Sequence, residues 1–241
     1  MIYRVIPNLL IANNKLVKGE KFKNHRYIGD PINALRLFND LEVDEIVLFD
    51  ISTAEKGIDF EYLEKLTSEC FVPLSYGGGI NHIQDIERLI RLGFEKVILN
   101  SALHSSTEII FEAASKFGSQ AIIACVDVRK SFMSKYYILT KSGEKIRLKQ
   151  HLNNIIATPV GEIIIQCVDR EGTLSGFDTG VLNELPTSLS VPLIVSGGFK
   201  DLSEMQLVQD DFNVQGVSAG AAFVFYGPHR AVLINYPKQV S

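Results

Sequence analysis

Eight short apolar runs recur along the chain, and each is followed by a turn and a stretch with helical periodicity. The runs are Ile2–Leu10, Glu45–Asp50, Val72–Tyr76, Lys96–Asn100, Ala121–Val126, Glu162–Val168, Val191–Ser196 and Val214–Ala219. Strands of a parallel sheet are buried on both faces and show such continuous runs, whereas half-buried antiparallel strands alternate with polar residues. The pattern therefore predicts an α/β protein with eight parallel strands.

The segments between these runs carry signals for helix ends. Ser105–Glu108 has the form of a capping box, and Gly118 is a suitable C-terminal stop for the same helix. In His82–Leu92 the apolar residues fall on one helical face, and Gly93 follows as a stop. We expect these segments to be helices that pack one face against the sheet.

Two segments differ from this pattern. Tyr136–Leu148 is predicted to form a β-hairpin around Lys141–Glu144, which would follow the fifth strand. The segment from Tyr226 onward is too short and too bounded by prolines for a full helix. We therefore expect a truncated last helix.

Eight βα units in 241 residues fit a closed (βα)8 barrel or a doubly wound open sheet. Similar residues recur at an offset of 117 to 119 positions: Glu45 and Glu162, Asp50 and Asp169, Gly79 and Gly198. Two similar four-strand halves, about 1–118 and 119–241, fit a barrel more naturally than an open sheet. We predict one (βα)8 TIM barrel domain over residues 1–241.

The charge balance excludes some classes of partner. The 24 basic and 28 acidic side chains give a net charge of −4, so the chain lacks the basic field that nucleic-acid binders need. No apolar run approaches the roughly 18 residues of a membrane span, and the first residues lack the features of a signal peptide. We expect a cytoplasmic protein with neither nucleic acid nor membrane as a partner.

Polar and glycine-rich clusters follow seven of the predicted strands. Two of them have phosphate-binding character: Gly77–Gly79 with Asn100–Ser101, and Ser196–Gly198 with Gly220–Ala221. Glycines let backbone N–H groups approach an anion, and helix N-termini add a partial positive charge. Two such clusters in opposite halves predict a long substrate with a phosphate at each end. The alternative is that the glycines only serve tight βα turns.

Two aspartates are candidates for acid/base chemistry. Asp127 and Asp169 each end an apolar run, and a carboxyl group in a dry barrel mouth can have a raised pKa. The alternative is that each caps a helix or braces a loop.

A third set of charges lies at the opposite strand ends. Arg4, Glu45, Lys96 and Glu162 are placed at the N-terminal ends of strands one, two, four and six. Their alternating signs could close a ring of ion pairs across the bottom of the barrel. Desolvation makes such a ring a poor source of stability, which favours a gating role over a plain structural plug.

Histidines and cysteines show no ligand spacing. His25, His82, His104, His151 and His229 have no partner pattern, and none is taken as catalytic. The three cysteines, Cys70, Cys125 and Cys167, lie in apolar stretches and are expected to be core thiols. We therefore expect neither a metal nor a cofactor.

Nearly the whole chain resembles the cyclase subunit of imidazole glycerol phosphate synthase, a (βα)8 barrel of the ribulose-phosphate-binding type. The resembling stretches are Leu16–Gly19, Gly29–Pro31, Asp44–Ile51, Gly77–Ile80, Phe117–Ala121, Asp169–Thr173 and Ser196–Gly198. Proteins of this family belong to histidine biosynthesis and act as lyases. They receive ammonia from a glutaminase (HisH-like) subunit docked at the N-terminal face and react it at the C-terminal face with a doubly phosphorylated ribulosyl carboxamide nucleotide.

The resemblance implies a role for many residues. It makes Arg4, Glu45, Lys96 and Glu162 the ring through which ammonia enters. It assigns substrate and phosphate binding to Lys18, Asp50, Gly78, Gly79, Asn100, Ser101, Asp169, Glu171, Gly172, Ser196, Gly197, Gly198, Gly220 and Ala221. It implies a heterodimer with the glutaminase and a phosphorylated small-molecule substrate.

The chain departs from the family at the catalytic pair. The second of the family's two catalytic aspartates matches Asp127, but Leu10 stands in the place of the first. Leucine carries no proton, and a general acid or base contributes about 10²- to 10⁴-fold, so cyclisation should be weak. Glu171 in place of the family's aspartate is a milder change, and Ala221 stands where the family usually has a serine hydroxyl.

This combination, together with the ending Gly227–Pro237, resembles a paralogous branch associated with surface polysaccharide genes. Three hypotheses follow: a cyclase that uses Asp127 alone, a non-cyclising ammonia conduit that serves amidation of a nucleotide sugar, and a scaffold that handles no ammonia. The charged ring makes the third the least favoured.

Overall fold

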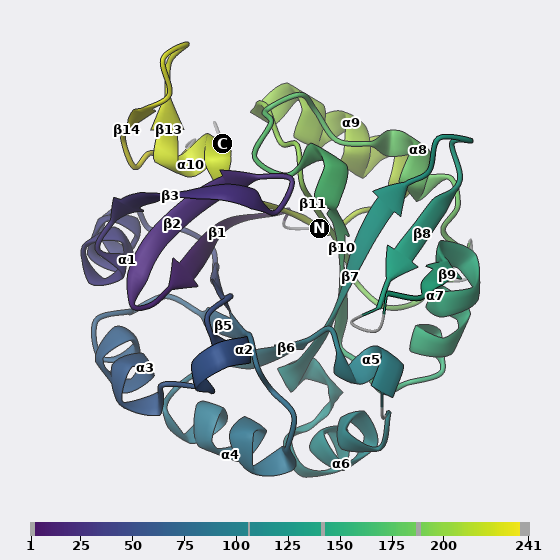
Figure 1. Ribbon diagram of the computed structural model, residues 1–241, viewed down its shortest axis with the longest axis horizontal. Helices are drawn as coiled ribbons and strands as arrows, with labels where there is room; N and C mark the ends of the chain where they lie inside the picture. The colour runs from purple at the N-terminus through teal and green to yellow at the C-terminus, as the bar shows by residue number, and fades with distance from the viewer. Residues whose placement is uncertain (1–2, 106, 141–142, 187–188, 237–241) are drawn as a thin grey trace.

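Eight parallel strands close into a barrel in the computed structural model, which describes residues 3–105, 107–140, 143–186 and 189–236. The barrel strands are β1 (Arg4–Ala12), β4 (Ile46–Asp50), β5 (Leu74–Gly77), β6 (Lys96–Leu99), β7 (Ile122–Lys130), β10 (Glu162–Cys167), β11 (Leu193–Ser196) and β12 (Gly216–Ala219). Each pairs with the next, and β12 pairs back with β1 (Figure 1). The predicted (βα)8 barrel is confirmed.

The helices surround this ring of strands (Figure 1). They are α1 (Pro31–Asp40), α2 (Thr53–Lys56), α3 (Phe60–Thr67), α4 (Ile83–Arg91), α5 (Ala102–Ser105), α6 (Glu108–Phe117), α7 (Leu148–Ile156), α8 (Thr179–Leu182), α9 (Leu202–Phe212) and α10 (Ala221–Val224), with 3₁₀ turns η1 (Ser119–Ala121) and η2 (Val168–Arg170). No described helix is both long and apolar enough to cross a membrane.

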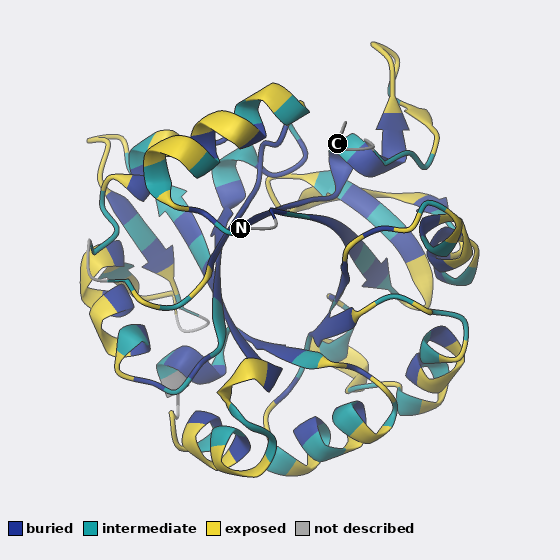
Figure 2. Ribbon diagram, turned by 180° about the vertical axis from the view of Figure 1, so that it is seen from behind, coloured by how far each residue is buried: buried dark blue, intermediate teal, exposed yellow. Residues whose placement is uncertain are grey.

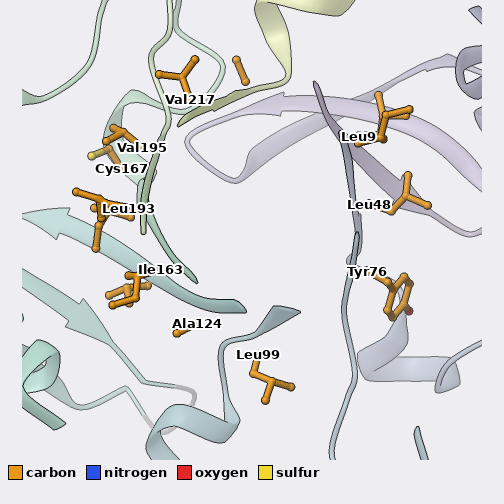
Figure 3. Packing of buried hydrophobic residues seen from close by; sticks show 14 of the residues in the cluster. Leu9, Leu48, Tyr76, Leu99, Ala124, Ile163, Cys167, Leu193, Val195 and Val217 are labelled. Carbon is orange, nitrogen blue, oxygen red and sulfur yellow. The ribbon is translucent and has the colours of Figure 1, made fainter. Parts of the chain in front are cut away.

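Alternate strand residues belong to two separate cores. Side chains such as Leu48, Ile163 and Val195 point away from the barrel axis into the layer of helices (Figure 3). Their neighbours in sequence, such as Val47 and Ile164, belong to a second buried cluster inside the barrel. The strands are therefore buried on both sides (Figure 2), which is the physical reason for their continuous apolar runs.

The boundaries of two strands differ from the prediction. β1 continues to Ala12 and β7 to Lys130, beyond the ends of their apolar runs. Each extension pairs with an antiparallel strand, as Ala12 does with Lys15 and Lys130 with Tyr136. Pairing with a hairpin keeps polar residues extended past the rim of the barrel.

One of the two hairpins was predicted and the other was not. β8 (Tyr136–Leu139) and β9 (Lys145–Arg147) confirm the hairpin after the fifth barrel strand, although Lys141 and Ser142 lie outside the described residues. The hairpin of β2 (Lys15–Glu20) and β3 (Lys23–Gly29) was missed. Because β3 is mostly exposed, it leaves no apolar alternation in the sequence.

The helix-end predictions have mixed outcomes. α4 begins after His82, whose N–H donates to Asp85, and α6 ends at Gly118, which has a φ of 83°. The capping box at Ser105–Glu108 is wrong, because Thr107 is the N-cap of α6 and its side chain makes no capping hydrogen bond. Ser105 instead ends α5, and Ser106 lies outside the described residues.

The last helix is short, as predicted. α10 spans four residues, and a small hairpin of β13 (Phe225–Tyr226) and β14 (Ala231–Val232) follows it. Of the predicted ending Gly227–Pro237, Pro237 lies outside the described residues.

Candidate active site at the C-terminal end of the barrel

A cavity of about 1010 Å³ opens at the C-terminal ends of the barrel strands. The predicted site residues that line it are Leu10, Lys18, Gly78, Gly79, Asn100, Ser101, Asp127 and Glu171. Those that do not line it are Asp50, Asp169, Gly172, Ser196, Gly197, Gly198, Gly220 and Ala221. The structure therefore brings half of the predicted set together around one space.

The first glycine cluster lies on the cavity wall. Gly78 and Gly79 have φ values of 143° and 66°, which side chains rarely adopt. A Cβ on Gly78 would collide with the carbonyl oxygen of Asp50, and one on Gly79 with the side chain of Thr53. The backbone here requires glycine, and it stays partly exposed to the cavity beside Asn100 and Ser101.

Asp127 is a buried acid at the cavity wall. Its Oδ2 accepts a hydrogen bond of 2.9 Å from Nδ2 of Asn100. Burial raises the pKa of Asp127 to about 6, although the Asn100 hydrogen bond and the Arg129 charge oppose the shift. A carboxyl group with this pKa can accept and return a proton near neutral pH.

Leu10 lies in the same cavity and offers no second acid. It is half-buried on β1, where it pairs with Phe49 of β4 and with Val17 of β2. An apolar side chain at this position gives the cavity one candidate proton carrier at the end of β7 and none at the end of β1.

A buried ion pair lines the cavity between the β2–β3 hairpin and the loop after β10. The Lys18 ammonium contacts Oε1 of Glu171, and these residues are 5% and 6% exposed. The second carboxylate oxygen of Glu171 accepts a hydrogen bond of 2.9 Å from Nε2 of Gln166. Burial alone would raise the pKa of Glu171, but Lys18 and Gln166 hold it below its ordinary value.

The second glycine cluster is closed off from the cavity. Ser196, Gly197, Gly198, Gly220 and Ala221 are all buried, and Ser196 is 0% exposed. The carbonyl oxygen of Gly198 accepts the N–H of Gly176 at 2.8 Å. The two clusters that match in sequence are therefore unlike in accessibility.

Two predicted acidic residues brace loops. Oδ1 of Asp50 accepts the N–H of Ser52 at 2.9 Å and its hydroxyl at 2.6 Å. Oδ2 of Asp169 accepts the N–H of Lys130 at 2.8 Å. Asp50 thus organises the turn that follows it, whereas Asp169 ties the loop after β10 to the end of β7, in line with the alternative interpretation given for Asp169.

Several residues at the cavity were not predicted. Asn8 and Gln166 occupy inward positions on β1 and β10, two residues after Ile6 and Ile164. A polar residue that interrupts an inward apolar series is a signal that could have identified them. Cys125 also lines the cavity, and burial raises its pKa well above the ordinary value, so it is not a reactive thiolate.

A pair of histidines lies at the cavity wall. The rings of His104 and His151 stack with their centroids 4.3 Å apart, and His104 lines the cavity. Burial lowers the pKa of His151 to about 4, so this ring is neutral at pH 7, and burial also lowers the pKa of His104. No group of three or more His, Cys, Asp or Glu side chains in the described part of the chain could hold a metal ion.

The four charged residues at the N-terminal strand ends close into a ring. Nη1 of Arg4 lies 2.9 Å from Oε2 of Glu45 and 3.0 Å from Oε1 of Glu162. Nζ of Lys96 lies 3.2 Å and 3.0 Å from the same two oxygens. Each cation thus bridges both carboxylates, and Oε1 of Glu45 also accepts the hydroxyl of Ser75 at 2.9 Å.

An apolar layer separates this ring from the cavity. It consists of the buried interior cluster Ile6, Val47, Ile98, Ile123, Cys125, Ile164 and Ile194, with Phe49 packed against it. The barrel is therefore charged at its N-terminal end, apolar at its middle and hollow at its C-terminal end.

The chain is similar to a known family over almost its whole length. Residues 4–229 match the model of the family described as histidine biosynthesis protein. A protein of Leptospira interrogans called "Putative imidazole glycerol phosphate synthase subunit HisF" is 38% identical over 98% of this chain and 95% of its own length. Proteins called subunit hisF2 in Pseudomonas aeruginosa and hisF3 in Vibrio vulnificus are each 39% identical over 97% of this chain and 95% and 92% of their own lengths. With its closed barrel, the chain belongs to the histidine biosynthesis protein family, in its HisF-like branch.

Proposed function

We propose that this protein is the ammonia-accepting barrel subunit of a glutamine amidotransferase, and that it carries out the cyclisation of its family only weakly. A HisH-type glutaminase docks at the N-terminal face as the other half of a heterodimer. Ammonia enters through the ring of Arg4, Glu45, Lys96 and Glu162 and leaves at the C-terminal cavity. The observation that carries the proposal is this ring, which lies at the opposite end of the same strands from the cavity.

The ring geometry suits a gate. Because Arg4 and Lys96 each contact both Glu45 and Glu162, one contact can break while the cation keeps the other. Oε2 of Glu162 is buried and accepts no hydrogen bond from any described residue. This oxygen is an available acceptor for a small donor such as ammonia.

The apolar layer between the ring and the cavity favours passage of a neutral molecule. Transfer of an ion into an apolar interior is far more costly than transfer of a neutral polar molecule. Uncharged ammonia therefore crosses between Ile6, Val47 and Ile164 more readily than ammonium or other hydrated ions do. This selectivity supports a conduit over a plain structural plug.

The cavity supports weak cyclisation. Asp127 is the one candidate proton carrier from the family's pair of aspartates, since Leu10 occupies the other position. Loss of one general acid or base lowers the rate by about 10²- to 10⁴-fold.

Two measurements test the proposal. Turnover of the ribulosyl carboxamide nucleotide with an ammonium salt should be slower by about 10²-fold or more than is usual for two-aspartate cyclases. A normal rate would exclude the loss of cyclisation. A HisH-type glutaminase encoded beside this chain should bind it and hydrolyse glutamine faster in the complex, and absence of both effects would exclude the conduit.

A second candidate concerns where the ammonia goes. Leu10 favours a destination outside this cavity, namely a separate enzyme that amidates a nucleotide sugar in the synthesis of a surface polysaccharide. Phe132 and Met133, both exposed in the turn between β7 and β8, supply apolar surface beyond the C-terminal end of β7. The test follows the amide nitrogen of ¹⁵N-labelled glutamine into the nucleotide sugar. This transfer should require both the glutaminase and the barrel subunit.

A further inference from the structure

The two glycine clusters differ in what covers them. Gly78 and Gly79 line the cavity, whereas Ser196, Gly197 and Gly198 are buried and do not reach it. Both clusters have left-handed or related glycine conformations, with φ values of 94° and 100° at Gly197 and Gly198. The difference therefore comes from the segments above them and not from the local backbone.

The loop after β10 forms a roof over the second cluster, because a Cβ on Gly198 would collide with the carbonyl oxygen of Gly176, and two further segments pack on this loop. The N–H of Lys21, in the β2–β3 turn, donates to the carbonyl oxygen of Glu171 at 2.9 Å. Gly172 packs so closely on Gly19 that a Cβ would collide with its carbonyl oxygen. Arg230, near the end of the described chain, contacts Glu20 and donates to the carbonyl oxygen of Thr173 at 3.3 Å.

Under this roof, the Lys18 ammonium takes the space beside the second cluster. A Cβ on Gly220 would collide with Nζ of Lys18 and with the carbonyl oxygen of Asn8. The charge of Lys18 is neutralised by Glu171, which Gln166 holds in place. A phosphate at Gly220 would have to displace the ammonium and lie beside a carboxylate, and juxtaposed like charges disfavour that arrangement.

We propose that the Lys18–Glu171 ion pair is a specificity element that restricts this cavity to ligands with a single phosphate group. That phosphate binds at Gly78, Gly79, Asn100 and Ser101. The ligand is a phosphate monoester of sugar size, with an uncharged far end that meets Asn8 and Gln166. The inference rests on the proposed function, which places a phosphorylated ligand at the C-terminal face.

Stoichiometry and ligand preference test the inference on the wild-type chain. Titration with inorganic phosphate, monitored by calorimetry and by ³¹P NMR, should give a stoichiometry of one bound phosphate per chain. Ribose 5-phosphate should bind within about threefold of ribulose 1,5-bisphosphate, because the second phosphate gains no partner. Two phosphates per chain, or a preference of about tenfold or more for the bisphosphate, would overturn the inference and leave the phosphate site itself standing. Absence of any phosphate binding would overturn both this inference and the phosphate site.

Variants of the ion pair locate the cause. Glu171→Gln frees the Lys18 charge and should raise affinity for the bisphosphate about tenfold while affinity for the monophosphate changes less than about threefold. Glu144→Gln is the matched control, since it removes another carboxylate from the same cavity and leaves the ion pair intact. The control should change both affinities by the same factor, and an equal response from Glu171→Gln would contradict the assignment.

A third variant locates the phosphate. Ser101→Asp puts a carboxylate in the first cluster and should lower affinity for inorganic phosphate by about tenfold or more. Unchanged affinity would contradict binding at this cluster. If Glu171→Gln does not fold, the wild-type stoichiometry and Ser101→Asp still decide the question.

Discussion

At the scale of single residues, chemistry depends on what surrounds each side chain more than on its type. Asp50, Asp127 and Asp169 all follow apolar strands, yet Asp50 and Asp169 brace loops and Asp127 faces the cavity. Their sequence contexts are alike, so the residue type and position alone could not separate them. The distinction comes from which partners the neighbouring strands supply.

Asp127 should destabilise the fold increasingly as the pH rises from about 4 to about 6. Because burial raises its pKa to about 6, against an ordinary value of about 3.9, the folded state favours the neutral acid. The free energy of unfolding therefore falls as the pH rises from about 3.9 to about 6 and stays level above that range, where both states are ionised. Asp127→Asn should raise that free energy by about 1–2 kcal/mol at pH 8, with little difference below pH 4.

Chemical denaturation at pH 4, 6 and 8 measures this effect. Asp169→Asn serves as the control, because its carboxylate lies at the same end of the barrel and is 43% exposed. No gain is expected from the control at pH 8. A gain from Asp127→Asn that does not vary with pH would contradict the assigned cause.

Leu10 is the residue with the sharpest consequence for catalysis. Leu10→Asp should raise kcat for cyclisation with an ammonium salt by at least about tenfold, because it supplies the missing proton carrier. KM should stay high, since the Lys18–Glu171 pair still blocks the second phosphate. Leu10→Asn is the control, because asparagine has nearly the shape of aspartate and carries no titrating group. An equal rise in kcat from this control would refute acid/base rescue.

At the scale of elements, predictability follows local burial. The eight barrel strands were predictable because each is buried on both faces and therefore has a continuous apolar run in its sequence. The β2–β3 hairpin was not, because its residues are largely exposed and its pairing depends on β1. That hairpin lines the cavity with Lys18, Gly19, Phe22 and His25, so the missed element is one that shapes the site.

The charged ring is an element built from four strands, and it should matter for stability. Glu45 is 3% exposed and accepts contacts from Arg4, Lys96 and Ser75. Glu45→Gln removes the charge and leaves both cations to share Glu162. We expect the free energy of unfolding to fall by about 2–4 kcal/mol, somewhat less than for a fully buried pair.

A surface ion pair provides the comparison for this variant. Arg36 and Glu69 form an exposed bidentate contact of 2.8 and 2.9 Å. Arg36→Gln should change stability very little, because solvent screens exposed pairs. Equal losses from both variants in urea denaturation would show that the ring has no special energetic role.

At the scale of the whole molecule, barrel closure joins the two sequence halves. β7 pairs with β6 and β12 pairs with β1, so a cut between Gly118 and Ser119 leaves four unpaired strand edges in two fragments. Unpaired edges promote association. Residues 1–118 and 119–241 expressed separately should form oligomers or aggregates, and co-expression should give a one-to-one complex, as measured by light scattering. Two stable monomeric fragments would contradict this expectation.

The sequence by itself determined the barrel and its charged ring, because periodic burial and position at a strand start are local properties. Only the tertiary structure decided which glycine cluster opens to the cavity. Lys18 and Glu171 are 153 positions apart, and their pairing depends on how an exposed hairpin packs on a distant loop. No local sequence pattern encodes such a contact, because the two side chains come close enough to interact only after the barrel has closed.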